Sequence, residues 1–161
     1  MTTIRSFRQS DADPDRALMN RVVDDGEAFV YDTPFDGNGI LAWIASWSQA
    51  FVAVDDCDRV VGAYVFRPNQ PGRGSHVANA AYLVDPAARG AGVGRALGAH
   101  SLTEARDAGF SAMQFNAVVA TNESAVRLWT GLGFSVIGRV PAAFRRKSGG
   151  YSDLLVMYRA L

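Results

Sequence analysis

The sequence predicts a single α/β domain built on a β-sheet of mixed strand direction, and three observations lead to this prediction. First, 161 residues, 48% of them hydrophobic, suffice for one domain that buries about 70% of its unfolded surface. Second, no composition break, repeat or low-complexity segment divides the chain, so we expect one domain over residues 1–161. Third, segments with the two-residue period of strands alternate with segments of helical period.

The first half of the chain predicts the order β, α, α, β, β, β. TIRSFR near the start is typical of a strand, and residues 10–29 predict a helix with Ser10 or Asp13 as its N-cap and Pro14 at an early position. GNGILAWIASW predicts a second helix. Three strands follow, joined by an Asp-rich turn and a Pro/Gly loop: QAFVAVD (49–55), RVVGAYVFR (59–67) and HVANAAYLVD (76–85).

The second half predicts the order α, β, α, β, β. Val93, Leu97, Leu102 and Ala105 have the spacing of one helix face, and a second helix is predicted over 122–133. The predicted strands are SAMQFNAVV (111–119), FSVIGRVPAAF (134–144) and YSDLLVMYRAL (151–161). This order implies about four helices and one internal βαβ crossover.

Charge and composition exclude several classes of partner. Sixteen basic and sixteen acidic residues give a net charge of zero, which lacks the positive field that nucleic-acid binding normally uses. The apolar stretches are too short to span a bilayer, and the N-terminus has no apolar signal region. The one cysteine, Cys57, is predicted to be a turn thiol. We therefore expect a cytoplasmic protein with no nucleic-acid or membrane partner and no metal.

Residues 89–98, RGAGVGRALG, predict a phosphate-binding loop between a strand and a helix. A dinucleotide fingerprint would need a third glycine at Arg95 or Leu97, and a Walker loop would need a lysine, so both alternatives fail. The pattern R-x-x-G-x-G remains, with Arg89, Gly92 and Gly94. Glycines allow close backbone approach and a helix N-terminus favours an anion, so a pyrophosphate fits.

This loop, with V-D-P before it and A-T-N-E-S-A-V-R-L-W-T-G-L-G-F after it, resembles the GNAT superfamily of acyl-CoA-dependent N-acetyltransferases, from about Gln49 to the C-terminus. The resemblance implies a mostly antiparallel sheet with a splayed parallel strand pair in its middle. It implies transfer of an acetyl group from acetyl-CoA, the cosubstrate, to the amine of a small molecule by direct attack on the thioester. A non-catalytic acyl-CoA-binding or sensing domain is the alternative.

The resemblance also implies the residues that bind the cosubstrate. Backbone amides from Gly90 to Ala96 would bind the pyrophosphate, and the strand end at Leu83 and Val84 would pair with the pantetheine arm. The alternative is a glycine-rich helix cap packed on a sheet. The implied set is Leu83, Val84, Arg89, Gly90, Gly92, Val93, Gly94, Arg95, Ala96, Asn122 and Trp129. For Arg95 a solvated loop end is an equal alternative, and for Asn122 helix capping is.

The leaving thiolate needs a proton and the tetrahedral oxyanion needs a donor. The family implies a backbone N–H near Leu83 or Val84 for the oxyanion. Many relatives carry a tyrosine for the thiolate where this chain has Trp129, whose indole does not titrate near neutral pH. We expect Trp129 to pack on the core or line the channel, and water, Tyr82 or Tyr158 to be the alternative donors.

Asn79 and Asn116 are candidate catalytic residues because each interrupts an apolar strand. A buried amide needs hydrogen-bond partners, which the two residues would find in each other or in the substrate. Asn116 is nearer its strand end, where ligands of α/β proteins collect.

The segment between the first two predicted helices is expected to shape the acceptor pocket. Its residues Tyr31, Asp32 and Phe35 are candidate substrate-binding residues, and a solvated loop is the alternative. Aromatic residues beside few charges favour a small acceptor over a basic peptide. The closing motifs resemble a branch of the family that acts on toxic amino-acid analogues, which suggests an amino acid or its analogue. A homodimer is left open.

Overall fold

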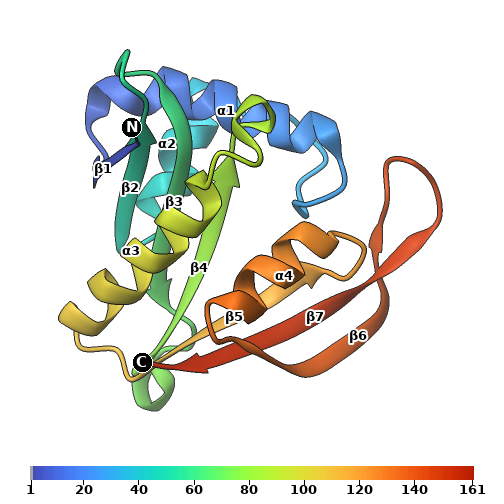
Figure 1. Ribbon diagram of the computed structural model, residues 1–161. Coiled ribbons are helices and arrows are strands. Elements are labelled where there is room, and N and C mark those ends of the chain that lie inside the picture. Colours follow the sequence, from blue (N-terminus) through green and yellow to red (C-terminus); the bar gives the residue numbers. More distant parts are fainter. Residues whose placement is uncertain (1) are drawn as a thin grey trace.

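The computed structural model describes residues 2–161 and orders seven strands in one sheet as β1-β2-β3-β4-β5-β7-β6 (Figure 1). The strands are β1 (Thr3–Ser6), β2 (Gln49–Val54), β3 (Val60–Pro68), β4 (Val77–Val84), β5 (Ala112–Val119), β6 (Ser135–Arg145) and β7 (Tyr151–Ala160). The helices of these residues are α1 (Ala12–Asp25), α2 (Gly37–Ala45), α3 (Val93–Asp107) and α4 (Glu123–Gly131), with short 3-10 turns η1 (Gln9–Asp11), η2 (Gly72–Gly74) and η3 (Pro86–Ala88). The predicted order of strands and α-helices is confirmed.

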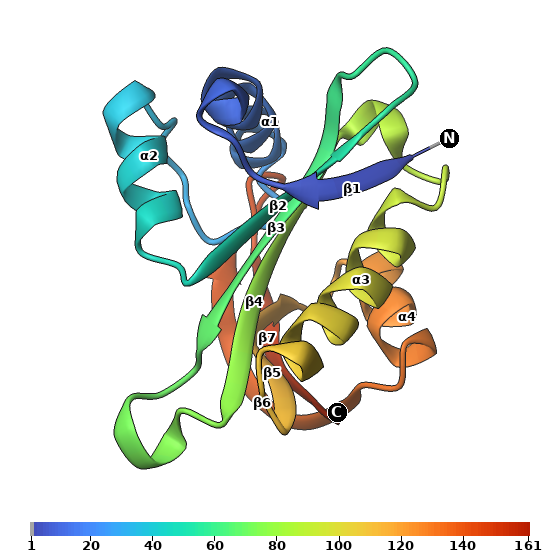
Figure 2. The ribbon, with the colours of Figure 1, turned by 90° about the vertical axis from the view of Figure 1, so that its left-hand side faces the viewer.

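The sheet separates two hydrophobic layers, with α1 and α2 on one face and α3 and α4 on the other (Figure 2). The α3 side contains aromatic and aliphatic side chains that include Phe51, Tyr64, Phe66, Leu97, Phe115 and Trp129. The α1 side contains mainly aliphatic side chains that include Leu18, Met19, Ile40, Val52 and Leu83. All strand pairs are antiparallel except β4 and β5, which confirms the expected fold class.

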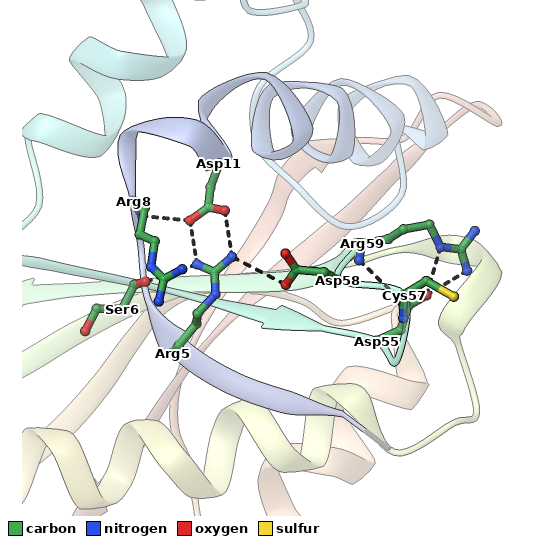
Figure 3. Close-up of polar contacts among 8 residues, drawn as sticks. All are labelled: Arg5, Ser6, Arg8, Asp11, Asp55, Cys57, Asp58 and Arg59. Carbon is green, nitrogen blue, oxygen red and sulfur yellow. Dashed lines mark hydrogen bonds and ion pairs between the residues drawn. The ribbon is translucent and has the colours of Figure 1, made fainter.

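The start of α1 is tied to β1 by an ion pair (Figure 3). Arg5 donates to both carboxylate oxygens of Asp11, at 2.7 and 2.9 Å, and lies 3.9 Å from Asp58. Asp11 is the N-cap residue of α1, so the prediction of Ser10 or Asp13 at this position was wrong. The η1 turn before the helix shifts its start by one to two residues, which the local sequence does not indicate.

The Asp-rich turn between β2 and β3 is held by its own side chains (Figure 3). Asp55 accepts from the backbone N–H of Cys57 at 2.9 Å and from the Arg59 guanidinium at 2.7 Å. Cys57 is exposed in this turn, as predicted. Asp55 therefore stabilises the turn that joins β2 to β3.

Candidate active site

A gap opens in the middle of the sheet where the parallel strands β4 and β5 separate (Figure 1). Only two register pairs join them, Val77 with Ala112 and Ala78 with Met113. Beyond Ala78, β4 remains paired with β3 along its whole length, so its other edge is unpaired. The predicted splayed pair is thus present, and it leaves backbone donors and acceptors of β4 available to a ligand.

The hydrogen-bond alternation of β4 decides which of these groups face the gap. Asn69 donates to the Val77 carbonyl at 2.8 Å, and Asp85 donates to the Val61 carbonyl at 2.9 Å. Antiparallel hydrogen bonds recur at every second residue, so the backbone groups of Leu83 also face β3. Those of Tyr82 and Val84 face the gap. Of the predicted pair Leu83 and Val84, the backbone of Val84 is therefore suitably placed, and that of Leu83 is not.

The glycine loop lies directly after the gap edge of β4, at the start of α3. Gly90 and Gly92 both have φ of +81°, a conformation that favours glycine. Among residues 2–161, apart from the adjacent residues of the chain, no atom lies within 4 Å of an added Cβ at either position. The N–H groups at the start of a helix have no partner within the helix. The loop therefore offers open space and free amides to a pyrophosphate, and the predicted residues Gly90, Gly92 and Val93 fit this group.

Gly94 has a packing reason to be glycine, in addition to the predicted one. An added Cβ would lie 3.2 Å from Leu128 Cδ2 and 3.6 Å from Val84 Cγ2. Its missing side chain therefore lets α3 pack closely on α4 and β4. Ala96 was also predicted to bind the pyrophosphate through its backbone N–H. That N–H donates to the Gly92 carbonyl at 3.0 Å and so forms a hydrogen bond of α3.

The two arginines beside the loop differ in their contacts. Arg89 donates to Asp25 at the end of α1, with Nη2 3.0 Å from Oδ2, and its side chain is 54% exposed. Arg95 is exposed on α3, and its Nη1 lies 3.6 Å from the position of an added Cβ at Gly131 in α4. Arg89 is thus held near the loop by a carboxylate, whereas Arg95 lies along α4.

Trp129 is a core residue. It is 6% exposed, and its ring centroid lies 4.5 Å from that of Tyr82 and 4.7 Å from that of Phe115. An added Cβ at Gly98 would approach Trp129 Cζ3 to 3.0 Å, so α3 packs directly on the indole. These contacts agree with the packing role expected for this side chain.

The hydroxyl of Tyr82 lies in the same layer, where it is 2.7 Å from Ser101 Oγ of α3. Ser101 is fully buried, and burial raises the pKa of the Tyr82 hydroxyl. The side chain thus points to the α3 side, away from the acceptor elements on the α1 side. The Tyr82 side chain packs in the α3 layer, and its role as a proton donor to the thiolate stays a prediction.

Asn122 caps α4. Its Oδ1 accepts from the Ala125 backbone N–H at 3.2 Å and from the Ser124 hydroxyl at 2.9 Å. Of the two roles expected for Asn122, helix capping is the one that these contacts fulfil. The cap also fixes the start of the helix that carries Trp129.

Amide side chains gather on the α1 side of the sheet near the vertex of the gap. Asn116 donates to Asn69 Oδ1 at 2.7 Å and accepts from Gln114 Nε2 at 2.9 Å. Asn79, half-buried, alternates along β4 with residues of the α3 side, so its side chain also faces α1 and α2. Asn116 is exposed and its hydrogen bonds go to Asn69 and Gln114, so of its two alternatives the internal pairing with Asn79 is not the one that these contacts form.

A cavity of about 470 Å³ lies between the α1–α2 connection and the β6–β7 hairpin. Tyr31 and Asp32, two of the predicted substrate-binding residues, line it together with Phe29, Val30, Pro34, Phe144 and Arg145. Phe35 does not line it. The Phe35 ring packs 5.2 Å from that of Tyr31, and its backbone N–H and carbonyl are both hydrogen-bonded to the side chain of Asn20.

The β6–β7 hairpin closes this cavity through ion pairs. Arg146 Nε donates to Glu27 at 2.9 Å, Lys147 Nζ donates to Asp24 at 2.9 Å, and Arg145 lies 3.6 Å from Asp32. The Arg145 and Lys147 side chains stay 76% and 59% exposed in this hairpin, so these ion pairs lie at the surface. The complementary charges of DDGE and RRK are a signal in the sequence, but nothing in it shows that segments so far apart meet.

Sequence reasoning missed two other features of the site region. Asn69 and Gln114, which hold Asn116, lie at a strand end and within a strand and have no motif around them. Tyr64 and His100 form a hydrogen bond between Oη and Nδ1 at 2.7 Å on the α3 side. The helical spacing of His100 from Val93 predicts only a boundary position, which the half-buried ring occupies.

The family is shown by comparison with known proteins. The family model described as "Acetyltransferase (GNAT) family" matches residues 13–134, most of the chain. The protein belongs to the GNAT family of acetyltransferases, and the resemblance inferred from the glycine loop and the α4 motif is confirmed. Each helix found within residues 2–161 is too short or too polar to span a bilayer. Among the same residues, no group of three or more His, Cys, Asp and Glu side chains could hold a metal ion.

Two curated relatives match shorter parts of the chain. N-acetyltransferase aca1 of Schizosaccharomyces pombe is 39% identical over 108 residues, which are 66% of this chain and 52% of aca1. Mycothiol acetyltransferase of Rhodococcus jostii is 53% identical over 49 residues, 30% of this chain and 15% of that protein. The chain thus spans about half the length of aca1 and less of the other relative.

Solved structures match over nearly the whole chain. A GCN5-related N-acetyltransferase from Kribbella flavida is 40% identical with a TM-score of 0.92, covering 99% of this chain and 98% of that one. The acetyltransferase yncA from Salmonella typhimurium, solved with its cofactor acetyl-CoA, is 26% identical with a TM-score of 0.89, covering 100% and 94% of the two chains.

Proposed function

We propose that this protein is an enzyme that transfers the acetyl group of acetyl-CoA to the amine of a small molecule. The observation that carries the proposal is the gap between β4 and β5, which opens directly before the loop with Gly90 and Gly92. The pantetheine arm would occupy the gap while the loop amides hold the pyrophosphate. Family membership and the acetyl-CoA-bound structure of yncA support this assignment.

Acetyl-CoA would supply the activated thioester, and the residues of this chain would orient the reaction. The backbone N–H groups of Val84 and Tyr82 face the gap and are candidates to donate to the developing oxyanion. Asn79 and Asn116 would orient the acceptor on the α1 side. Amide side chains do not titrate, so they can align an amine but cannot take its proton, and the amine must arrive neutral.

We propose further that the acceptor is an amino acid or a close analogue. The cavity is compact and has aromatic walls from Phe29 and Tyr31. Its lining offers both charges of an amino acid a partner, because Asp32 and Arg145 lie 3.6 Å apart with both side chains exposed. A cytoplasmic location is proposed on the exposed thiol of Cys57, which suits a reducing compartment.

The test is an acetylation assay with purified protein, acetyl-CoA and an equimolar mixture of small amines, amino acids and basic peptides. Release of free CoA thiol gives the rate, and mass spectrometry identifies the acetylated product. We expect acetylated amino acids or related small amines. Transfer chiefly to the peptides would overturn the acceptor assignment. Tight binding of acetyl-CoA with no thiol release above the buffer rate would favour a non-catalytic binding domain.

A further inference from the structure

Four consecutive residues that begin in the last turn of α1, Asp24–Glu27 (the DDGE turn), contact both the glycine loop and the β6–β7 hairpin. On one side, Asp25 Oδ2 accepts from Arg89 Nη2 at 3.0 Å. On the other side, Asp24 and Glu27 pair with Lys147 and Arg146. A single short segment thus links the proposed cosubstrate site with the wall of the acceptor cavity (Figure 1).

The hairpin side of this link is closely fitted. Both carboxylate oxygens of Glu27 are used, because Oε2 accepts from Arg146 Nε at 2.9 Å and Oε1 accepts from the Ser148 N–H at 3.0 Å. Hydrogen bonds from Ser148 and Arg146 lower the pKa of the Glu27 carboxyl to about 2, so Glu27 is ionised at neutral pH. An added Cβ at Gly26 would lie 2.5 Å from Lys147 Cβ, so the backbones approach as closely as glycine allows.

The cosubstrate side of the link has free hydrogen-bonding capacity. A guanidinium has five N–H donors, and the Asp25 contact of Arg89 uses one of them, on Nη2. The remaining donors can bind a phosphate oxygen while Nη2 stays with Asp25. A second ion pair, Arg21 with Asp85 at 2.8 Å, holds the same end of α1 to the end of β4. Arg89 can therefore bridge the carboxylate of Asp25 and a bound phosphate.

We propose that the DDGE turn couples acetyl-CoA binding to the acceptor cavity, with Asp25 and Glu27 as positioning residues. The coupling rests on the proposed function, since it requires a pyrophosphate on the glycine loop. The bound pyrophosphate fixes Arg89, Arg89 fixes Asp25, and the rest of the turn holds the hairpin that lines the cavity. Order gained at one site then lowers the entropic cost of binding at the other, so the acceptor binds more tightly once acetyl-CoA is bound.

Hydrogen exchange of the full chain with and without CoA tests the coupling directly. In the unmodified protein, CoA slows exchange of the amides of residues 90–96 and also of residues 145–149. In Asp25→Ala, the first region still responds and the second does not. Asp13→Ala is the matched control, because Asp13 is an exposed aspartate of α1 whose ion pair, with Arg16 at 3.4 Å, is remote from both sites. We expect the Asp13→Ala variant to show the same response to CoA as the unmodified protein in both regions.

The outcomes separate this coupling from the function on which it rests. No response to CoA at residues 90–96 of the unmodified protein would remove the proposed cosubstrate site itself. A response there without one in the hairpin, or an equal hairpin response in Asp25→Ala, would overturn the coupling alone.

Glu27→Gln gives a second, kinetic readout with the best amine of the acetylation panel. We expect the acceptor KM to rise about fivefold while the KM for acetyl-CoA and kcat stay within about twofold. Glu27→Asp, which keeps the charge, should recover part of the loss. An unchanged acceptor KM in Glu27→Gln would overturn the positioning role of Glu27.

Discussion

The glycine loop and the acceptor cavity, the two halves of the proposed active site, are held in place by different kinds of contact. The loop belongs to one continuous stretch from β4 into α3, anchored by the buried side chains of Val93 and Leu97. The cavity is framed by two segments that are 119 residues apart at Glu27 and Arg146, joined largely through part-exposed or exposed ion pairs. One half is fixed by packing and the other by charge.

The difference has an energetic meaning. Buried aromatic and aliphatic side chains contribute about 1.5–3 kcal/mol each, whereas an exposed ion pair contributes about 0–1 kcal/mol and is screened by salt. The cosubstrate half should therefore be rigid and the acceptor half more easily deformed. Changes in the acceptor half can alter what is acetylated without disturbing how the acetyl donor is bound.

Removing the indole that anchors the cosubstrate half should have the largest effect. Trp129→Ala is expected to lower the free energy of unfolding by about 3–5 kcal/mol, because removal of the indole leaves a void between α3, α4 and the sheet. Urea denaturation measures it. Trp129→Phe keeps most of the packing and should retain activity within about tenfold. A hundredfold loss in a folded Phe variant would instead indicate a proton-transfer role.

Helix α1, which covers the acceptor side of the sheet, contains a buried acid. Asp15 of α1 is 3% exposed, and its Oδ1 has no hydrogen-bond partner among residues 2–161. Burial, and to a lesser extent the nearby Asp11 carboxylate, raise the pKa of Asp15 from 3.8 to about 7. Between pH 4 and pH 7 the folded state holds a proton on Asp15 that the unfolded chain has released. The free energy of unfolding therefore falls as the pH rises from about 4 to about 7.

Asp15→Asn cannot ionise and should lack this pH dependence. Relative to the unmodified protein, its free energy of unfolding is expected to gain about 3 kcal/mol between pH 5 and pH 8. Urea denaturation at the two pH values gives the difference. If the two proteins lose stability in parallel over this range, Asp15 is ionised in the folded state and the interpretation fails.

A negative charge in the glycine loop should weaken acetyl-CoA binding without unfolding the protein. Ala91 is exposed between Gly90 and Gly92, and Ala91→Glu should reduce affinity about 100-fold through repulsion of the pyrophosphate. Thr103→Glu, exposed farther along α3, is the control with equal charge. Equal affinities of both variants for acetyl-CoA, measured by calorimetry, would show that this loop does not bind the pyrophosphate. Gly94 is unsuitable for the test because it packs on Leu128.

Asn116→Ala should have a smaller effect, confined to the kinetics of the acceptor. Loss of one oriented amide is expected to lower kcat/KM for the best small amine about tenfold, with the KM for acetyl-CoA unchanged. Steady-state kinetics with each substrate varied in turn separates the two. Gln114→Ala, which removes the donor to Asn116, should give part of the same loss. If Asn116→Ala is fully active, the amide cluster does not contact the acceptor.

Prediction from sequence succeeded where the signal was local. The helix cap at Asn122, the exposed turn at Cys57 and the place of the glycine loop at the start of α3 were predicted correctly from a few neighbouring residues. It misjudged the burial of Asn116, because an amide inside an apolar strand looks buried unless one knows that the strand separates from its neighbour. For Tyr82, strand alternation does not reveal which layer its hydroxyl enters, so only the structure placed it against Ser101.

The sequence by itself determined the family, the order of strands and helices, and the position of the glycine loop. Each can be predicted from short motifs or from the periodicity of residues close in the chain, because backbone geometry fixes the spacing of such residues. Only the tertiary structure decided that β4 and β5 part after two residue pairs, and that the DDGE turn meets the β6–β7 hairpin. Those features depend on how distant segments pack, and the many charge pairings available to exposed Asp, Glu, Arg and Lys side chains differ too little in energy to be told apart beforehand.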